Sequence, residues 1–182
     1  MLAGGDWYRF ESDLPVSLHR TINGLLNEQV GRYPGSWRYR HERTSDLLYL
    51  TPQRRKVRVT REAGPGGRLL GVMEKRRVAD LSLHVPASPV DVRISVNTET
   101  RITAPPEDTL RSWTLELERQ KDRRTYEYDH WLQVDLTQVV QGPHDVRHEL
   151  ELELVNTQQQ LLDPAMPFRF VCNLLDIARR LS

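Results

Sequence analysis

In the stretch RHELELELV at residues 147–155, glutamate and leucine alternate from 149 to 154. In an extended strand successive side chains point to opposite faces, so Glu149, Glu151 and Glu153 share one face and the leucines share the other. Carboxylates two positions apart lie ~7 Å from each other, and at an effective dielectric of about 20 they repel by roughly 2 kcal/mol. The pattern predicts a β-strand. If its acidic face is enclosed, it requires divalent cations or opposing Lys and Arg side chains. A half-exposed strand with solvated carboxylates is the alternative.

A second alternating segment, RQKDR at 119–123, carries basic residues. Its spacing places Arg119, Lys121 and Arg123 on one face of another strand. A solvated strand edge is the simpler alternative, since charged residues there discourage aggregation. Three more cations and one carboxylate in strand-like contexts weigh against it: Arg58, Lys75, Arg93 and Glu99. A closed antiparallel barrel lined by these side chains would bring a basic row and the acidic row across a lumen. Phosphate chains bound with a metal need that combination.

The remaining chain predicts further strands between two helices. Apolar residues recur at helical spacing over 14–30 and over 167–181. Between them we expect two short strands within 37–60, a hairpin turn at 63–67, and strands over 68–75, 90–103, 113–128, 131–139 and 147–155. The expected fold class is mainly β (α+β): a closed or nearly closed antiparallel β-barrel with flanking N- and C-terminal helices, in one domain over 1–182.

Composition argues against a disordered, an exported or a membrane protein. Of the 182 residues, 38% are hydrophobic and 28% are charged, as in soluble globular domains. No uncharged apolar run approaches the ~20 residues that span a bilayer, and the first residues lack a signal-peptide core. The single cysteine, Cys172, suits a reducing compartment. The net charge of +1 hides a basic concentration at 54–77 and 119–124 and an acidic one at 149–153, which favours a site with facing charges over a general nucleic-acid-coating surface.

A family resemblance rests on three segments: ERQKDR at 118–123, VDLTQV at 134–139 and HELELE at 148–153. Earlier segments extend it: FESDLP at 10–15, RVT at 58–60, EKRR at 74–77 and DVRISVNTE at 91–99. In order and spacing, these segments resemble the mRNA-capping RNA 5′-triphosphatases of fungi and protozoa, which are triphosphate tunnel metalloenzymes of CYTH-like fold. The resemblance covers nearly the whole chain, and its specificity lies in the ordered set of motifs.

The resemblance implies a role for each matching residue. Five cations would contact phosphate oxygens or brace the glutamates: Arg58, Lys75, Arg119, Lys121 and Arg123. Four carboxylates would form the catalytic set: Glu99, Asp135, Glu149 and Glu151. Glu99 and Asp135 would organise the wall of the tunnel or orient the attacking water. Glu149 and Glu151 belong to the C-terminal glutamate motif. Glu153 would be the ligand of a metal, Mg²⁺ or Mn²⁺.

The implied reaction is the attack of water on the γ-phosphate of a 5′-triphosphate RNA end, which leaves a diphosphate end for guanylylation. The metal would neutralise developing charge and position the phosphates. The resemblance further implies a nuclear protein with 5′-triphosphate RNA as substrate and the mRNA guanylyltransferase as a candidate partner. A homodimer is left open, and no membrane is involved.

Two departures from the family pattern bear on these expectations. In the family, a first barrel strand with a Glu-x-Glu motif precedes the segment that matches 10–15, and residues 1–8 contain no such motif. We therefore expect the first barrel strand to be missing, the metal to bind this chain weakly, and this chain alone to hydrolyse triphosphate RNA poorly. Glu116 and Glu118 offer no substitute, because their alternation places them opposite the basic row. Gln133 also stands where family members can carry arginine, which weakens one contact.

Two other functions remain in competition. One is a catalytically inactive tunnel barrel that acts as a scaffold, as in the Mediator head subunit that resembles this fold. The other is a hydrolase of free nucleoside triphosphates or inorganic polyphosphate, since a tunnel recognises phosphates more than bases. Zinc is not supported, because the six histidines lack ligand spacing. A P-loop is disfavoured, because the glycines at 64–71 are not followed by Gly-Lys-Ser/Thr.

Overall fold

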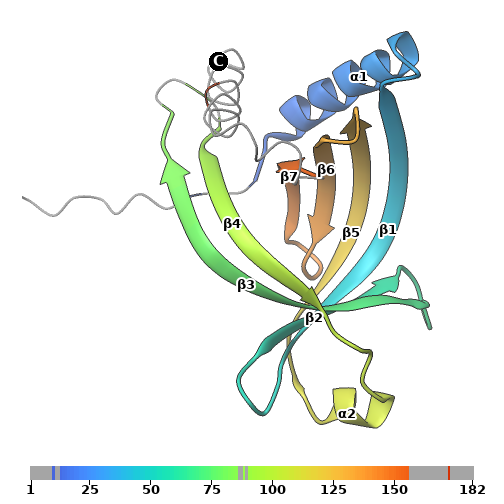
Figure 1. The fold of residues 1–182 in the computed structure, drawn as a ribbon, viewed down its shortest axis with the longest axis vertical. Coiled ribbons are helices and arrows are strands. Elements are labelled where there is room, and N and C mark those ends of the chain that lie inside the picture. The colour runs from blue at the N-terminus through green and yellow to red at the C-terminus, as the bar shows by residue number, and fades with distance from the viewer. Residues whose placement is uncertain (1–9, 11–12, 86–87, 89, 156–171, 173–182) are drawn as a thin grey trace, which may run out of the picture.

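The computed structural model describes residues 10, 13–85, 88, 90–155 and 172. Within them, seven strands form one antiparallel sheet in the order β4-β3-β2-β1-β5-β6-β7, accompanied by two helices (Figure 1). The strands are β1 (Trp37–Leu50), β2 (Lys56–Glu62), β3 (Leu69–Leu83), β4 (Val92–Arg101), β5 (Thr114–Tyr128), β6 (Leu132–Val140) and β7 (Val146–Leu154). The helices are α1 (Val16–Arg32) and α2 (Glu107–Arg111).

The mainly β prediction and the first helix are confirmed, and three elements differ in detail. β1 is one 14-residue strand, where the sequence predicted shorter pieces. β3 has 15 residues and continues past the predicted end at 75. α2 was not predicted, because its five residues are too few to show a helical period. The expected helix over 167–181 and the expectation about residues 1–8 lie outside the described residues.

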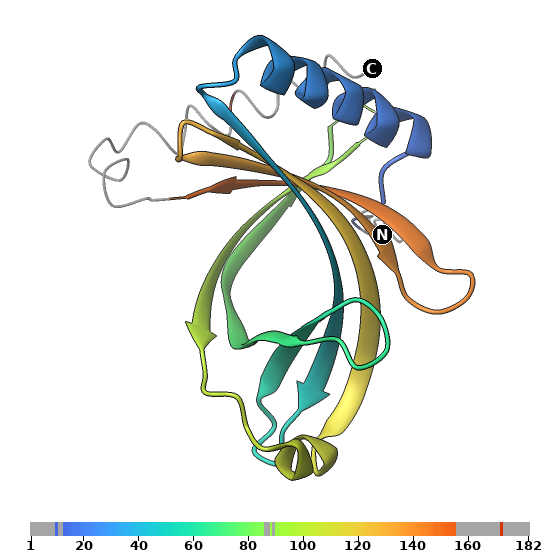
Figure 2. The same cartoon turned by 90° about the vertical axis from the view of Figure 1, so that its right-hand side faces the viewer.

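The sheet curls into half of a tunnel (Figures 1 and 2). Strand twist and three register shifts, at Leu48/Tyr49, Thr60/Arg61 and Arg77/Ala79, bend it. The curl brings distant strands together: the charge of Lys75 on β3 acts on Glu153 of β7, although four strands separate β3 from β7 in the sheet. Among the described strands β4 and β7 are the sheet edges, so these strands form an open half-barrel rather than a closed one.

The two faces of the sheet differ in chemistry. We call the concave side the lumen face and the side that the helices cover the outer face. On the outer face, one apolar core lies beneath α1 and is centred on Tyr126 and Leu136, both fully buried. A second core lies beside α2 and includes Val59 and Val72. Apolar packing is therefore concentrated on the outer face, which leaves the lumen face to polar side chains.

Helix α1 is held to the outer face by polar contacts as well as by packing. The Tyr126 hydroxyl lies 2.8 Å from Oδ1 of both Asn23 and Asn27 on α1. Just before the helix, the backbone N–H of Leu14 donates to the carbonyl of His148 on β7 (2.7 Å). Among the described helices, none combines the length and apolar character needed to cross a membrane.

Candidate active site

The register of the sheet arranges the predicted site residues in rows across the lumen face. Opposite each other on neighbouring strands lie Arg123, Thr137 and Glu149 in one row, and Asp135 and Glu151 in the next. Side chains directly opposite each other in an antiparallel sheet share a face. The structure therefore places the basic row of β5 and the acidic row of β7 on the same face, with β6 between them.

Arg123 connects the two rows. Its guanidinium lies 3.2 Å from Asp135 and 3.5 Å from Glu151. Asp135 is fully buried, and it also accepts hydrogen bonds from Thr125 Oγ1 (2.6 Å) and Gln133 Nε2 (3.0 Å). Because three donors surround this carboxylate, its position is fixed, and it orients Arg123 in turn. Gln133 thus keeps a contact with Asp135 at the position where arginine can occur in the family.

A second buried ion pair lies deeper on the lumen face. Lys121 Nζ is 2.7 Å from Asp46, which also accepts a hydrogen bond from Thr60 Oγ1 at 2.7 Å. Burial acts to raise the pKa of Asp46, but Lys121 and Thr60 outweigh it and hold the pKa below its usual range. Arg119 approaches the same carboxylate at 3.8 Å. Asp46 thus anchors two cations of the predicted phosphate site.

Asp46 is a site residue that was not predicted from the sequence. It stands in the polar stretch RTSD at 43–46, which has no clear alternation, and nothing local distinguishes it from a turn or edge residue. Its partners lie on other strands, since Thr60 opposes it on β2 and Arg119 opposes it on β5. Only the pairing of β1 with β5 could have predicted its role.

The remaining predicted cations occupy the other side of the curl. Glu99 on β4 accepts ion pairs from Lys75 (3.1 Å) and Arg58 (3.7 Å). These three predicted residues are therefore brought together. Arg93 does not join them within the described structure. Its guanidinium carbon lies 4.6 Å from the centre of the Phe10 ring.

Three buried polar atoms on the lumen face have no hydrogen-bond partner among the described residues: Arg58 Nε, Arg119 Nε and Thr137 Oγ1. Buried donors without partners are rare in folded proteins, because each costs the free energy of its lost hydration. Two of these donors belong to guanidinium groups, which bind phosphate oxygens well. The lumen face is therefore chemically suited to an anion such as a phosphate chain.

The glutamates of β7 show the electrostatic repulsion that the sequence predicted. Burial raises the pKa of Glu149 and of Glu153, and neighbouring Glu151 raises both further. Arg123 acts in the opposite direction on both carboxyls but does not cancel the effect. A divalent cation would reverse this cost. The described residues contain no group of three potential ligands close enough to hold an ion. The glutamates of β7 could therefore supply only some of the ligands of a metal.

The raised pKa values predict an unusual dependence of stability on pH. A carboxyl whose pKa is higher in the folded state binds its proton more tightly there. As pH rises from the ordinary value near ~4.3 through the raised one, stability is therefore lost. We expect the Glu149→Gln/Glu153→Gln variant, in chelator, to unfold at higher urea than the parent at pH 7 and at similar urea near pH 4.

The exposed Glu116 provides the control, since Glu116→Gln is expected to leave the urea midpoint unchanged at both pH values. Asp46, whose depressed pKa acts in the opposite sense, is present in every variant and cancels in the comparison. Coincident pH profiles for the double variant and the parent would show that the row is solvated.

Comparison with known sequences finds one family model, described as "mRNA capping enzyme, beta chain", that matches residues 3–165. The mRNA-capping enzyme subunit beta of Schizosaccharomyces pombe is 36% identical over 160 residues, which cover 81% of this chain and 50% of that protein. The subunit of Cryptococcus neoformans var. neoformans is 34% identical over 180 residues, which cover 90% of this chain and 43% of that protein. The chain thus spans half or less of these relatives.

Solved structures agree with the sequence comparison. The S. pombe Pct1 RNA triphosphatase in complex with the Spt5 CTD superposes with a TM-score of 0.75 at 34% identity, covering 95% of this chain and 70% of that one. The Mimivirus capping enzyme triphosphatase superposes with a TM-score of 0.60 at 13% identity, covering 93% and 86% of the two chains. At that identity, the viral protein supports the fold alone.

Proposed function

Since this chain belongs to the family of mRNA capping enzyme beta chains, we propose that it supplies the phosphate-handling face of an RNA 5′-triphosphatase. The reaction is removal of the γ-phosphate from triphosphate-ended nascent mRNA, the first step of cap formation. The observation that carries the proposal is the junction at Arg123, where the basic row of β5 meets Asp135 and Glu151 on one lumen face.

The cations bind and orient the triphosphate. Lys121 is fixed by Asp46, and Lys75 by Glu99, so both ammonium groups are positioned before the substrate arrives. Arg58 and Arg119 keep a buried donor that no described residue uses, and phosphate oxygens are its natural acceptors. Charge that is already oriented costs no reorganisation during the reaction, and it is the largest source of rate enhancement in phosphoryl transfer.

The carboxylates handle the attacking water. Water forms a bond to the γ-phosphorus while the bond from phosphorus to the β–γ bridging oxygen breaks, giving inorganic phosphate and a diphosphate RNA end. Glu149, whose pKa is raised, accepts the proton of the attacking water. Glu151 orients that water, because Arg123 holds it in place. Asp135 and Glu99 keep the cations aligned.

We assign the metal dependence of this activity to Mg²⁺ or Mn²⁺, with Glu153 as a ligand. When bound, the ion supplies positive charge that neutralises the phosphates. The raised pKa of Glu153 supports this role, because a buried carboxylate without a full counter-charge gains most from a cation.

The proposed partners follow from the relatives. They are named as beta subunits of the mRNA-capping enzyme, so the mRNA guanylyltransferase is the proposed companion and the nucleus the proposed location. The S. pombe Pct1 enzyme was solved with the Spt5 CTD, so a CTD of that kind is a second proposed partner. A homodimer remains a proposal that sedimentation of the purified protein would test.

Phosphate release from γ-³²P-labelled triphosphate RNA, with Mg²⁺ or Mn²⁺ and with chelator, tests the function. We expect slow metal-dependent release of orthophosphate and a diphosphate RNA product, because the described residues supply only some of the ligands of a metal. ATP and tripolyphosphate serve as competing substrates. Faster turnover of ATP or tripolyphosphate than of RNA would favour a nucleotide or polyphosphate hydrolase, and absence of release from any of them would favour a scaffold.

A further inference from the structure

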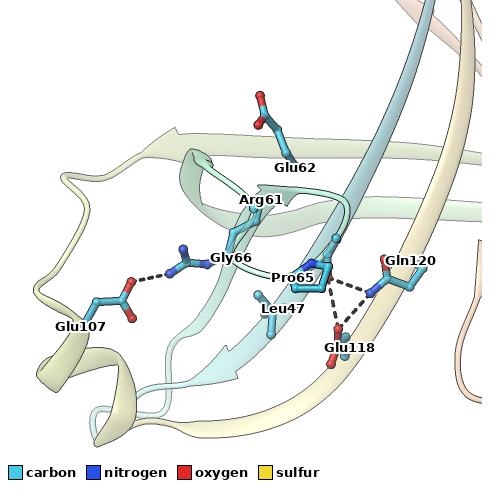
Figure 3. A pocket seen from close by; sticks show the side chains of 11 residues that line it. Leu47, Arg61, Glu62, Pro65, Gly66, Glu107, Glu118 and Gln120 are labelled. Atoms are coloured by element: carbon cyan, nitrogen blue, oxygen red, sulfur yellow. Dashed lines mark hydrogen bonds and ion pairs between the residues drawn. The ribbon is translucent and has the colours of Figure 1, made fainter.

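A groove lies on the outer face of the sheet, on the side opposite the candidate active site. Its volume is about 680 Å³, which is in the range of ligand-binding pockets. Ser45 and Leu47 of β1 and Glu118 and Gln120 of β5 form its floor. The β2–β3 loop closes one side and α2 lies at one end (Figure 3).

The loop that closes the groove has a defined shape. Gly64 and Gly66 adopt positive φ angles of 110° and 69°, which few other residues tolerate. At Gly67, an added Cβ would lie 1.9 Å from the carbonyl oxygen of Glu62, so only glycine fits at this position. Pro65, between these glycines, faces the groove as an apolar surface (Figure 3).

The charges of the groove are not balanced. Arg61 pairs with Glu107 across the groove, and Glu62 pairs with Arg68 at 2.8 Å. Among the described residues, Glu118 accepts hydrogen bonds only from the neutral groups Ser45 Oγ (3.3 Å) and Gln120 Nε2 (3.0 Å). No described Lys, Arg or His lies within ion-pair distance of it. One carboxylate, oriented by two donors, therefore faces the groove without a counter-charge.

We propose that this groove docks an extended basic segment of a partner protein. A Lys or Arg side chain of that segment pairs with Glu118, and its aliphatic stem lies on Leu47 and Pro65. Long basic side chains commonly bury their stems on apolar surface while the charged head meets a carboxylate. The carboxylates of the lining would repel the phosphates of RNA, so charge complementarity selects a cationic peptide.

The position of the groove separates docking from catalysis. Glu118 and Arg119 are successive residues of β5, so their side chains point to opposite faces of the sheet. A segment bound against Glu118 leaves Arg119, Lys121 and Arg123 accessible to substrate. The partner would therefore recruit the protein without blocking the lumen.

A matched pair of variants on β5 tests the proposal. The probe is a fluorescein-labelled nonapeptide of alternating lysine and alanine, measured by anisotropy at low ionic strength, beside the same peptide with acetylated lysines. We expect Glu118→Gln to weaken binding of the lysine peptide roughly fivefold. Glu116→Gln changes another exposed carboxylate of β5 that does not line the groove, and we expect less than about a twofold change.

Amide chemical shifts of the labelled protein locate the peptide. Shifts at Gly64–Gly67, Glu118 and Gln120, together with unchanged triphosphatase activity of Glu118→Gln, would support the groove. Three outcomes would overturn the proposal: no binding of the lysine peptide, equal binding of the acetylated peptide, or equal effects of the two variants. Shifts confined to the glutamates of β7 would place the peptide in the lumen and overturn it as well.

Discussion

Replacing Lys121 by methionine is expected to lower the free energy of unfolding by about 3–5 kcal/mol, the usual cost of removing one member of a buried ion pair. Lys121 and Asp46 are 8% and 3% exposed, and their charged groups lie 2.7 Å apart. Methionine fills a similar volume, so the change in the free energy of unfolding reports the loss of the charge rather than a loss of packing. It leaves Asp46 buried with Thr60 and the more distant Arg119 and Arg58 to compensate it. Urea unfolding at pH 7 measures the change.

Two controls separate this effect from loss of packing. The Asp46→Asn/Lys121→Met double variant removes both charges, and we expect it to recover much of the stability that the single variant loses. Lys56→Met removes an exposed lysine whose partner Glu116 lies 3.8 Å away, and it should cost under ~1 kcal/mol. If Lys121→Met lowers the free energy of unfolding no more than Lys56→Met does, the lumen is solvated and its ion pairs do not stabilise the fold.

The second large effect is expected at Arg123. Changing it to alanine should lower kcat/KM for triphosphate RNA by a factor of about 10² to 10³, as removal of an oriented donor at a developing negative charge usually does. The loss would have two causes, because in the proposed site Arg123 contacts the phosphates and also holds Asp135 and Glu151. The measurement is the initial rate of γ-phosphate release at saturating metal, with thermal unfolding to check the fold.

The neighbouring Arg124 is a matched control. Its side chain is 31% exposed against 29% for Arg123, but it lies on the outer face and pairs with Asp122. We expect Arg124→Ala to keep kcat/KM within about twofold of the parent. Similar losses in both variants would mean that the substrate does not occupy the lumen face.

The acidic and basic rows could be predicted from the sequence because strand alternation is a local signal. At β7 each glutamate is followed by a leucine, so the period of two identifies both the strand and its faces. The same reasoning predicted that Glu118 points away from the basic row, and its hydrogen bonds with Ser45 and Gln120 confirm this. The roles proposed for these residues came from the family resemblance rather than from the alternation.

Other features depend on pairing between strands distant in sequence. After Trp37 and Tyr39, only polar residues follow as far as Asp46, so the period of two does not continue through β1 and does not mark it as a single strand. Asp46 gains its role only because β1 lies between β2 and β5. The outer groove combines a loop, a five-residue helix and two strands, and no local pattern encodes that combination. The register and the curl depend on how all the strands pair, so they cannot be predicted from the sequence of one strand alone.

A crystal structure of the protein soaked with tripolyphosphate and Mn²⁺ tests most directly whether the lumen face is the catalytic phosphate site. We expect phosphate density on the lumen face within hydrogen-bonding distance of Arg119 and Arg123, and an anomalous manganese signal beside Glu153. Phosphate bound on the outer face, or manganese bound away from β7, would contradict the assignment of the active site to the lumen.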